Sequence, residues 1–180
     1  MDQKRRKNIS KFLSLILRHS PETIGLQLDE QGWADIPELM GKAARRGQRF
    51  TMEELLVVVA ECEKQRFALS EDHTRIRANQ GHSVKVELEL EAATPPEYLY
   101  HGTVGKFMQA IREEGLLKMS RHHVHLSEQR ETAIAVGARR GQPVILTVHS
   151  GRMFRDGILF FRSANNVWLT DHVPVKYIAF

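Results

Sequence analysis

The sequence has little cysteine and no long hydrophobic run. Cys62 is the only cysteine among 180 residues, so the chain can form no internal disulfide and no cysteine-rich zinc site. The longest purely apolar run, Leu55 to Ala60, is far shorter than the ~20 residues of a membrane-spanning helix. The first residues, MDQKRRKNIS, are polar and lack the apolar stretch of a signal peptide. We therefore expect a cytoplasmic protein with no membrane partner.

The chain also lacks low-complexity segments and a strong excess of one charge. Hydrophobic residues make up 42% and charged residues 27% of it, which excludes collagen-like and disordered classes. The formal net charge is only +4, as a solvated and mildly basic surface would give. Locally, however, arginines cluster, and the planar guanidinium suits bidentate contacts to phosphate. The clustered arginines, our candidate contacts to nucleic-acid phosphates, are Arg45, Arg46, Arg49, Arg75 and Arg77.

The first half of the chain predicts three helices followed by a β-hairpin. Asp35 can cap the second helix, and Thr51 opens the third with a capping box. Apolar and turn patterns place the helices at residues 8–19, after residue 35 and at 51–64, and the two strands at 66–70 and 74–78. This order is that of a winged-helix module, a fold that binds either nucleic acids or proteins.

The second half predicts a mixed, strand-rich domain. Residues 84–90 alternate between apolar and polar, as in a strand with one wet face, and the two prolines within 92–96 then predict a linker. Gly115 and Gly141 suit the ends of two helices. These helices are expected at 104–114 and 128–139, with strands at 98–101, 124–127, 144–149, 158–161, 167–169 and 173–178. The fold class expected for the whole chain is α+β.

Several common catalytic templates are missing. The sequence has no glycine-rich phosphate loop, no H-E-x-x-H and no G-x-S-x-G. His122, His123 and His125 could suggest a metal site. On a strand, however, residues 123 and 125 share a face that residue 122 does not, and no carboxylate or cysteine stands at ligand spacing. We therefore predict that the protein holds no metal.

Four short segments carry residues suited to chemistry on phosphates. They contain Arg18 and His19, Arg66, His101, and Arg121 with His125. Each also admits a purely structural role. Cations favour a helix C-terminus, where they meet the negative end of the helix dipole, and an arginine can pair with any surface carboxylate. Taken singly, these segments decide nothing.

Together with their neighbours, these segments form an ordered set. The set is Arg18-His-Ser-Pro21, Gln27-Leu-Asp-Glu-Gln-Gly-Trp33, Gln80-Gly-His-Ser83, Tyr100-His-Gly-Thr103, Val124-His-Leu-Ser127, Val136-Gly-Ala-Arg139 and Pro143-Val-Ile-Leu146. In these motifs and their order, the chain resembles the RNA 2′-phosphotransferase (KptA) family over essentially its whole length. The resemblance implies a winged-helix RNA-binding lobe, residues 1–91, and an NAD-binding lobe with an ADP-ribosyltransferase-like mixed sheet, residues 97–180. One departure is visible, because the second of two lysines that the family often carries before Arg66 is here Gln65.

The resemblance also implies an enzyme that consumes NAD as a co-substrate. In the family's reaction an internal 2′-phosphate of RNA, as at a tRNA splice junction, attacks the anomeric carbon of the NAD ribose and expels nicotinamide. The neighbouring ribose hydroxyl then attacks the phosphodiester. This second step frees the RNA 2′-hydroxyl and releases ADP-ribose 1″,2″-cyclic phosphate.

The same resemblance assigns the site residues. The catalytic set is Arg18, His19, Arg66 and Arg121. The NAD-binding set is His101, Gly102, Thr103, His125 and Ser127. The arginines orient the phosphate and stabilise charge in the second step, and we expect the glycine to let the ligand approach the backbone closely. We expect the site between the two lobes and a monomeric protein.

Two other functions remain open at this point. An ADP-ribosyltransferase that caps terminal phosphates of RNA or DNA would use the same fold and stop after the first step, since a terminal phosphate lacks a comparable leaving hydroxyl. A non-catalytic winged-helix protein would bind RNA without releasing nicotinamide. The segments around Arg18-His19 and Tyr100-His-Gly-Thr103 argue against the non-catalytic alternative.

Overall fold

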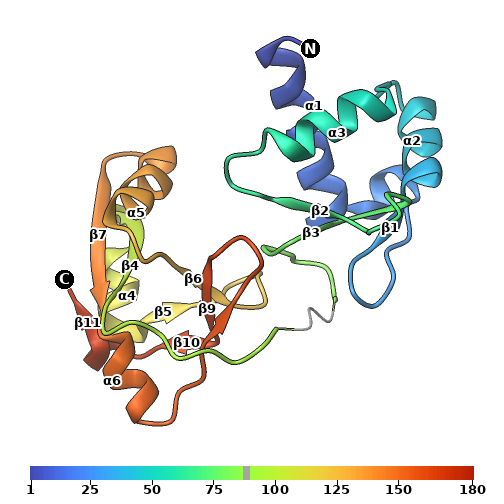
Figure 1. The fold of residues 1–180 in the computed structure, drawn as a ribbon. Helices are drawn as coiled ribbons and strands as arrows, with labels where there is room; N and C mark the ends of the chain where they lie inside the picture. Colours follow the sequence, from blue (N-terminus) through green and yellow to red (C-terminus); the bar gives the residue numbers. More distant parts are fainter. Residues whose placement is uncertain (87–89) are drawn as a thin grey trace. The chain divides into compact units, whose positions relative to one another are not determined.

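The chain folds as two units, each with its own hydrophobic core. The computed structural model describes residues 1–86 and 90–180, which divide into an N-terminal unit, Met1–Glu89, and a C-terminal unit, Leu90–Phe180 (Figure 1). Both units combine helices with small antiparallel sheets, so the α+β class is confirmed. None of the described helices has the length and apolar character that crossing a membrane requires.

The N-terminal unit packs three helices against a three-stranded sheet. Its elements are α1 (Gln3–Arg18), the 3-10 helix η1 (Pro21–Ile24), β1 (Ala34–Asp35), α2 (Ile36–Arg45), α3 (Met52–Ala60), β2 (Phe67–Leu69) and β3 (Arg75–Ala78). The sheet is antiparallel with the order β1-β3-β2. Leu13 and Leu17 of α1, Leu55 of α3 and Ile76 of β3 are fully buried in the core of this unit.

The predicted helix caps are present in this unit. The Asp35 carboxylate accepts from the Glu38 N–H at 2.8 Å, and Thr51 and Glu54 form the reciprocal capping box. Helix α1 begins five residues earlier than predicted, because Asp2 caps it and its polar first turns are tied to α3. Helix α3 ends at Ala60 rather than near residue 64.

The C-terminal unit contains two three-stranded sheets and one two-stranded sheet. The sheet orders are β11-β7-β4, β6-β9-β8 and β10-β5. The strands are β4 (Leu99–Val104), β5 (Leu116–Leu117), β6 (Val124–Leu126), β7 (Pro143–Val148), β8 (Phe161–Arg162), β9 (Trp168–Thr170), β10 (His172–Val173) and β11 (Ile178–Ala179). The helices are η2 (Gly105–Phe107), α4 (Met108–Glu114), α5 (Arg130–Gly137), η3 (Ala138–Arg140), α6 (Ser150–Arg155) and η4 (Val175–Tyr177).

Four predictions for residues 84–180 differ from the structure. Of the strand expected at 158–161, only Phe161 lies in a strand, β8. Of the strand expected at 84–90, residues 84–86 and 90 are not in a strand, and residues 87–89 lie outside the described residues. The expected strand 173–178 is wrong, because Pro174 has no N–H to donate and the chain turns there through η4. The segment 92–96, expected as a linker, is tied to its unit by the Ala93 N–H, which donates to the Phe160 carbonyl at 2.9 Å.

Candidate active site

Three of the expected catalytic residues converge within the N-terminal unit. Arg18 is the last residue of α1, and His19 caps the helix end, where the dipole favours cations. Nη2 of Arg18 donates to the carbonyl oxygen of Arg66 at 3.5 Å. The Arg66 side chain in turn lies with Nη1 3.5 Å from Sγ of Cys62. Arg18 and Arg66 are 48 positions apart in the sequence, yet their backbone segments lie close together in the fold.

Ser83 holds the Arg18-His19 pair from a segment to which the sequence analysis gave no role. Its N–H donates to the Arg18 carbonyl at 2.8 Å, and its Oγ also reaches that carbonyl at 3.5 Å. The same Oγ lies 2.9 Å from Nδ1 of His19. A hydroxyl that donates to a carbonyl can accept from an imidazole N–H, so Ser83 orients the His19 ring. The signal in the sequence was the motif Gln80-Gly-His-Ser83.

Asn79 fixes the turn that carries Arg66. Its N–H donates to the Arg66 carbonyl at 2.9 Å, and its side-chain Nδ2 donates to the Gln65 carbonyl at 2.6 Å. Gln65, the departure from the family pattern, has φ 39°, in the left-handed region that few non-glycine residues adopt. Asn79 therefore stabilises an unfavourable backbone conformation immediately before Arg66.

In the C-terminal unit, His101 is held in one tautomer. Its Nδ1 lies 3.0 Å from the carbonyl oxygen of His125, and because a carbonyl can only accept, Nδ1 carries the proton. Burial lowers the pKa of His101 below its ordinary value of 6.5, and the positive charges of Arg121 and Arg140 lower it further, against the opposing effect of the hydrogen bond. The ring is therefore neutral at neutral pH, with Nε2 as an acceptor.

Arg121 belongs to a cluster of cations in this unit. Its Nη1 lies 3.2 Å from Nδ1 of His125, which accepts because a guanidinium has only donors. Burial lowers the pKa of Arg121, and repulsion from Arg140 and Arg139 adds to that effect. Within the described part of the chain, no carboxylate lies at ion-pair distance from these three arginines. Such a cluster suits an anion, and Arg139 and Arg140 were missed although the motif ending at Arg139 pointed to them.

The backbone N–H and C=O of Gly102 lie on an unpaired edge of β4 in the residues described. Tyr100 of β4 exchanges backbone hydrogen bonds with Ser127, the residue that follows β6, at 2.8 Å and 2.9 Å, and in the residues described this is an isolated bridge. Backbone groups alternate between the two edges of a strand, so Gly102, two residues on, turns its N–H and C=O to the same edge as Tyr100. Past the bridge, this edge offers a donor and an acceptor close to His101.

Packing gives a further reason for a glycine at position 102, one that the sequence analysis did not foresee. A Cβ at this position would lie 1.8 Å from the Ala133 carbonyl oxygen and 3.0 Å from the Gly137 nitrogen, both in α5. The missing side chain therefore admits helix α5 against β4, not a ligand, on that face of the strand. Thr103, the next residue, is buried.

His123, which the sequence analysis weighed as a metal ligand, lies against an aromatic ring. The His123 ring packs against Phe161 with centroids 5.7 Å apart, and burial lowers its pKa. Among residues 1–86 and 90–180, no three His, Cys, Asp or Glu side chains gather in a way that could hold a metal ion.

Comparison with known proteins identifies the family. The model of the "RNA 2'-phosphotransferase, Tpt1 / KptA family" matches residues 4–172. The chain belongs to this family. It is an enzyme of the transferase class, and RNA carrying a 2′-phosphate is the substrate that the family name gives.

Individual relatives of this RNA 2′-phosphotransferase are similar over their full length. A protein of Flavobacterium johnsoniae named "Probable RNA 2'-phosphotransferase" is 62% identical over 180 residues, which cover 100% of this chain and 99% of that protein. A protein of the same name from Streptomyces coelicolor is 57% identical over 180 residues, covering 100% and 98%. The resemblance drawn from the seven motifs is therefore confirmed.

Proposed function

We propose that this RNA 2′-phosphotransferase removes an internal 2′-phosphate from RNA, as at a tRNA splice junction, with NAD as the acceptor. The reaction passes through an ADP-ribosylated RNA phosphate and releases nicotinamide and ADP-ribose 1″,2″-cyclic phosphate. One observation supports the NAD dependence. The acceptor Nε2 of His101 and the backbone N–H and C=O of Gly102, on the open edge of β4, are offered by neighbouring residues.

These donors and acceptors complement the hydroxyl and carboxamide groups at the nicotinamide riboside end of NAD. A ribose hydroxyl donates to Nε2 of His101, and the carboxamide exchanges hydrogen bonds with the N–H and C=O of Gly102. Thr103 extends this contact along β4, while His125 of β6 and Ser127, which follows β6, line the neighbouring segment. We assign the anion-binding cluster at Arg121, Arg139 and Arg140 to phosphate groups brought together there.

The proposed chemistry needs cations more than it needs a base. In the first step the 2′-phosphate oxygen forms a bond to the anomeric carbon, and the glycosidic electron pair leaves with nicotinamide and neutralises its charge. No proton moves. Arg18, Arg66 and Arg121 orient the anion for this attack, since each guanidinium meets two phosphate oxygens at once.

The second step moves one proton. The ribose hydroxyl loses its proton as it attacks phosphorus, and the RNA 2′-oxygen gains one as it leaves. Negative charge develops on the phosphoryl oxygens, where Arg66 and Arg121 stabilise it. We propose that His19, oriented by Ser83, handles the proton at the leaving oxygen.

We also propose finer assignments for the fold and its setting. Three helices followed by the antiparallel sheet β1-β3-β2 support a winged-helix RNA-binding lobe in the first half of the chain. The two three-stranded sheets that part after the Tyr100–Ser127 bridge support an ADP-ribosyltransferase-like NAD-binding lobe in the second half. We further propose that the enzyme acts as a cytoplasmic monomer.

A product assay tests the proposed function. The enzyme is incubated with nicotinamide-labelled NAD and a short RNA that carries one internal 2′-phosphate, with the same RNA lacking that phosphate as the control. We expect nicotinamide release that depends on the 2′-phosphate, with the dephosphorylated RNA as the final product. RNA that remains stably ADP-ribosylated, or release that requires a terminal phosphate, would instead identify a capping ADP-ribosyltransferase.

A further inference from the structure

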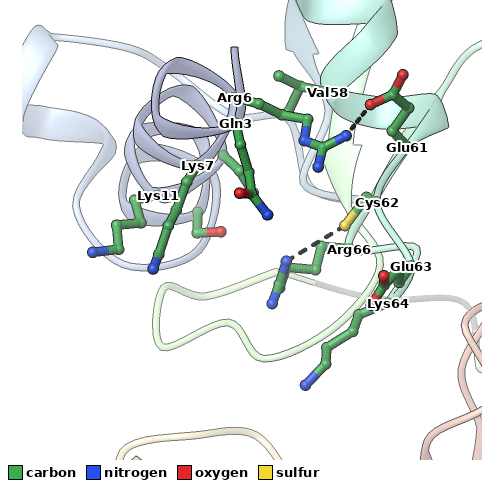
Figure 2. Close-up of a pocket in the computed structure, with 12 residues that line it drawn as sticks. Gln3, Arg6, Lys7, Lys11, Val58, Glu61, Cys62, Glu63, Lys64 and Arg66 are labelled. Carbon is green, nitrogen blue, oxygen red and sulfur yellow. Dashed lines mark hydrogen bonds and ion pairs between the residues drawn. The ribbon is translucent and has the colours of Figure 1, made fainter.

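A basic groove of about 410 Å³ lies in the N-terminal unit, between α1 and the turn that follows α3 (Figure 2). Two acidic side chains, Glu61 and Glu63, line it, and no aromatic side chain does. Its five basic lining residues are Arg6, Lys7, Lys11, Lys64 and Arg66. The groove therefore carries an excess of positive charge and offers no aromatic ring on which a nucleic-acid base could stack.

Lys7 and Lys11 are the cations in the groove that the fold does not explain. Arg6 pairs with Glu61, but in the described part of the chain no carboxylate lies at ion-pair distance from Lys7 or Lys11, and both are exposed. They stand one turn apart on α1, so about 6 Å of helix axis separates them. Neighbouring phosphates along an extended nucleic-acid strand have a similar spacing.

The groove begins at a proposed catalytic residue. The Arg66 carbonyl accepts from Arg18 at the C-terminal end of α1, and the lining then follows α1 back through Lys11 and Lys7 to Gln3. Any RNA whose 2′-phosphate contacts Arg66 must continue from that nucleotide as a charged strand. The groove runs from Arg66 in one direction, so it offers a basic path to the RNA on only one side, 5′ or 3′, of that nucleotide.

We propose that this groove binds the backbone phosphates of the RNA segment adjoining the 2′-phosphorylated nucleotide, on one side of it. The proposal rests on the proposed function in one respect, the contact between Arg66 and the 2′-phosphate. Since Lys7 and Lys11 supply the exposed charge of the path and no aromatic side chain lines it, binding along it depends on phosphate charge and not on base sequence.

RNA binding in the absence of NAD tests the groove. Single-stranded RNAs with one 2′-phosphate are extended by a few nucleotides on either the 5′ or the 3′ side, and their dissociation constants are measured over a range of salt concentrations. We expect tighter binding from extension on one side alone, and we expect the variant Lys7→Gln/Lys11→Gln to lose that gain. Loss of two phosphate contacts lowers the salt slope by about 1.4, which reduces the effect of raising salt from about 50 to about 200 mM by about sevenfold.

The variant Lys4→Gln/Lys176→Gln is the matched comparison, because it removes the same charge at two exposed lysines that do not line the groove. An unchanged dissociation constant and slope in the groove variant would overturn the proposal. Equal losses of RNA affinity in the two variants would also overturn it, because they would indicate a general electrostatic attraction of RNA to the protein rather than binding along the groove. Nicotinamide release by the unchanged enzyme is measured separately, so failure of the proposed NAD chemistry remains distinguishable from failure of the groove.

Discussion

Arg66 of the N-terminal unit lies beside Cys62, and Arg121 of the C-terminal unit lies beside His125. In the described residues no carboxylate lies at ion-pair distance from either arginine. Their charge is therefore available to a substrate. The first proposed step needs only an aligned anion and a cationic leaving group. The second step develops new charge on phosphorus-bound oxygens, so it should depend more strongly on these two residues.

We predict that Arg121→Ala and Arg66→Ala accumulate ADP-ribosylated RNA. Loss of one preorganised charge contact costs about 3–4 kcal/mol, or about a hundred- to a thousandfold in the rate of the second step. Gel separation of labelled RNA over time measures the intermediate. Arg18→Ala, at the proposed docking point of the RNA phosphate, serves as the comparison and should slow both steps. Equal slowing of both steps in every variant would contradict this division of roles.

The pH dependence of NAD binding follows from His101. Its lowered pKa keeps Nε2 an acceptor below pH 6.5, so NAD affinity should hold there and fall only as the pH drops through the lowered pKa. Arg140→Gln removes a positive charge that lowers this pKa, so the fall should move to higher pH. Arg139→Gln is the control, because Arg139 perturbs Arg121 but is not among the groups that shift His101. Titration of NAD affinity against pH gives both midpoints, and coincident midpoints would contradict the assignment.

The segment from Asn79 to Ser83 illustrates how one short element positions residues that are distant in sequence. Ser83 lies 65 residues from Arg18 and 64 from His19, yet it bonds to both. We predict that Ser83→Ala lowers kcat about fivefold, as expected for losing a hydrogen bond of about 1 kcal/mol, with little change in KM.

Two further variants separate positioning by Ser83 from a merely structural role. Ser83→Thr keeps the hydroxyl and should restore kcat. In a His19→Ala background, Ser83→Ala should have no further effect on kcat, because its partner is gone. An equal additional loss in that background would show that Ser83 acts on something other than His19.

The contact between β4 and α5 predicts a large stability effect from a single methyl group. Gly102→Ala would place Cβ 1.8 Å from the Ala133 carbonyl oxygen, so helix and strand must separate. Overpacking of this kind costs about 1–3 kcal/mol. Urea unfolding of Gly102→Ala should show this loss, whereas Gly105→Ala, with nothing within 4 Å of its Cβ, should unfold like the original protein. Similar midpoints for both variants would contradict the packing explanation.

Local signals explain which elements the sequence predicted. Asp35 and Thr51 cap helices through contacts within three residues, so their pattern is visible in the sequence. Helix α6 escaped prediction because it has only six residues and is held by distant partners. Its Ser150 hydroxyl donates to the Pro96 carbonyl at 2.7 Å, and Arg155 pairs with Glu97.

Within the candidate site, too, the sequence predicted some features and not others. The ordered motifs contain Arg18 and His101, and the family resemblance that they carry assigned Arg66, because residue types and their order are properties of the sequence alone. The tautomer of His101 depends on a carbonyl 24 residues away, which no local pattern encodes. The packing role of Gly102 was missed for the same reason, since α5 approaches it only in the folded unit.

At the scale of the whole molecule, we predict that activity is independent of divalent metal. The chemistry proposed here relies on guanidinium groups, and the described residues offer no cluster of metal-ligating side chains. Nicotinamide release in excess chelator should equal the untreated rate. A short single-stranded RNA is the right substrate, because it removes the effect of magnesium on RNA folding. Complete loss of activity that a divalent ion restores would contradict the prediction.

Each unit contains one of the two tryptophans, and their surroundings differ. Trp33, in the N-terminal unit, is half-buried under the guanidinium groups of Arg75 and Arg77, at 5.4 Å and 4.6 Å from its ring. Trp168, in the C-terminal unit, is buried and donates from Nε1 to Glu128 at 2.7 Å. The protein therefore has an intrinsic fluorophore in each half. A Trp33→Phe or Trp168→Phe variant leaves emission from one unit alone, so the unfolding of each half can be followed without an added label.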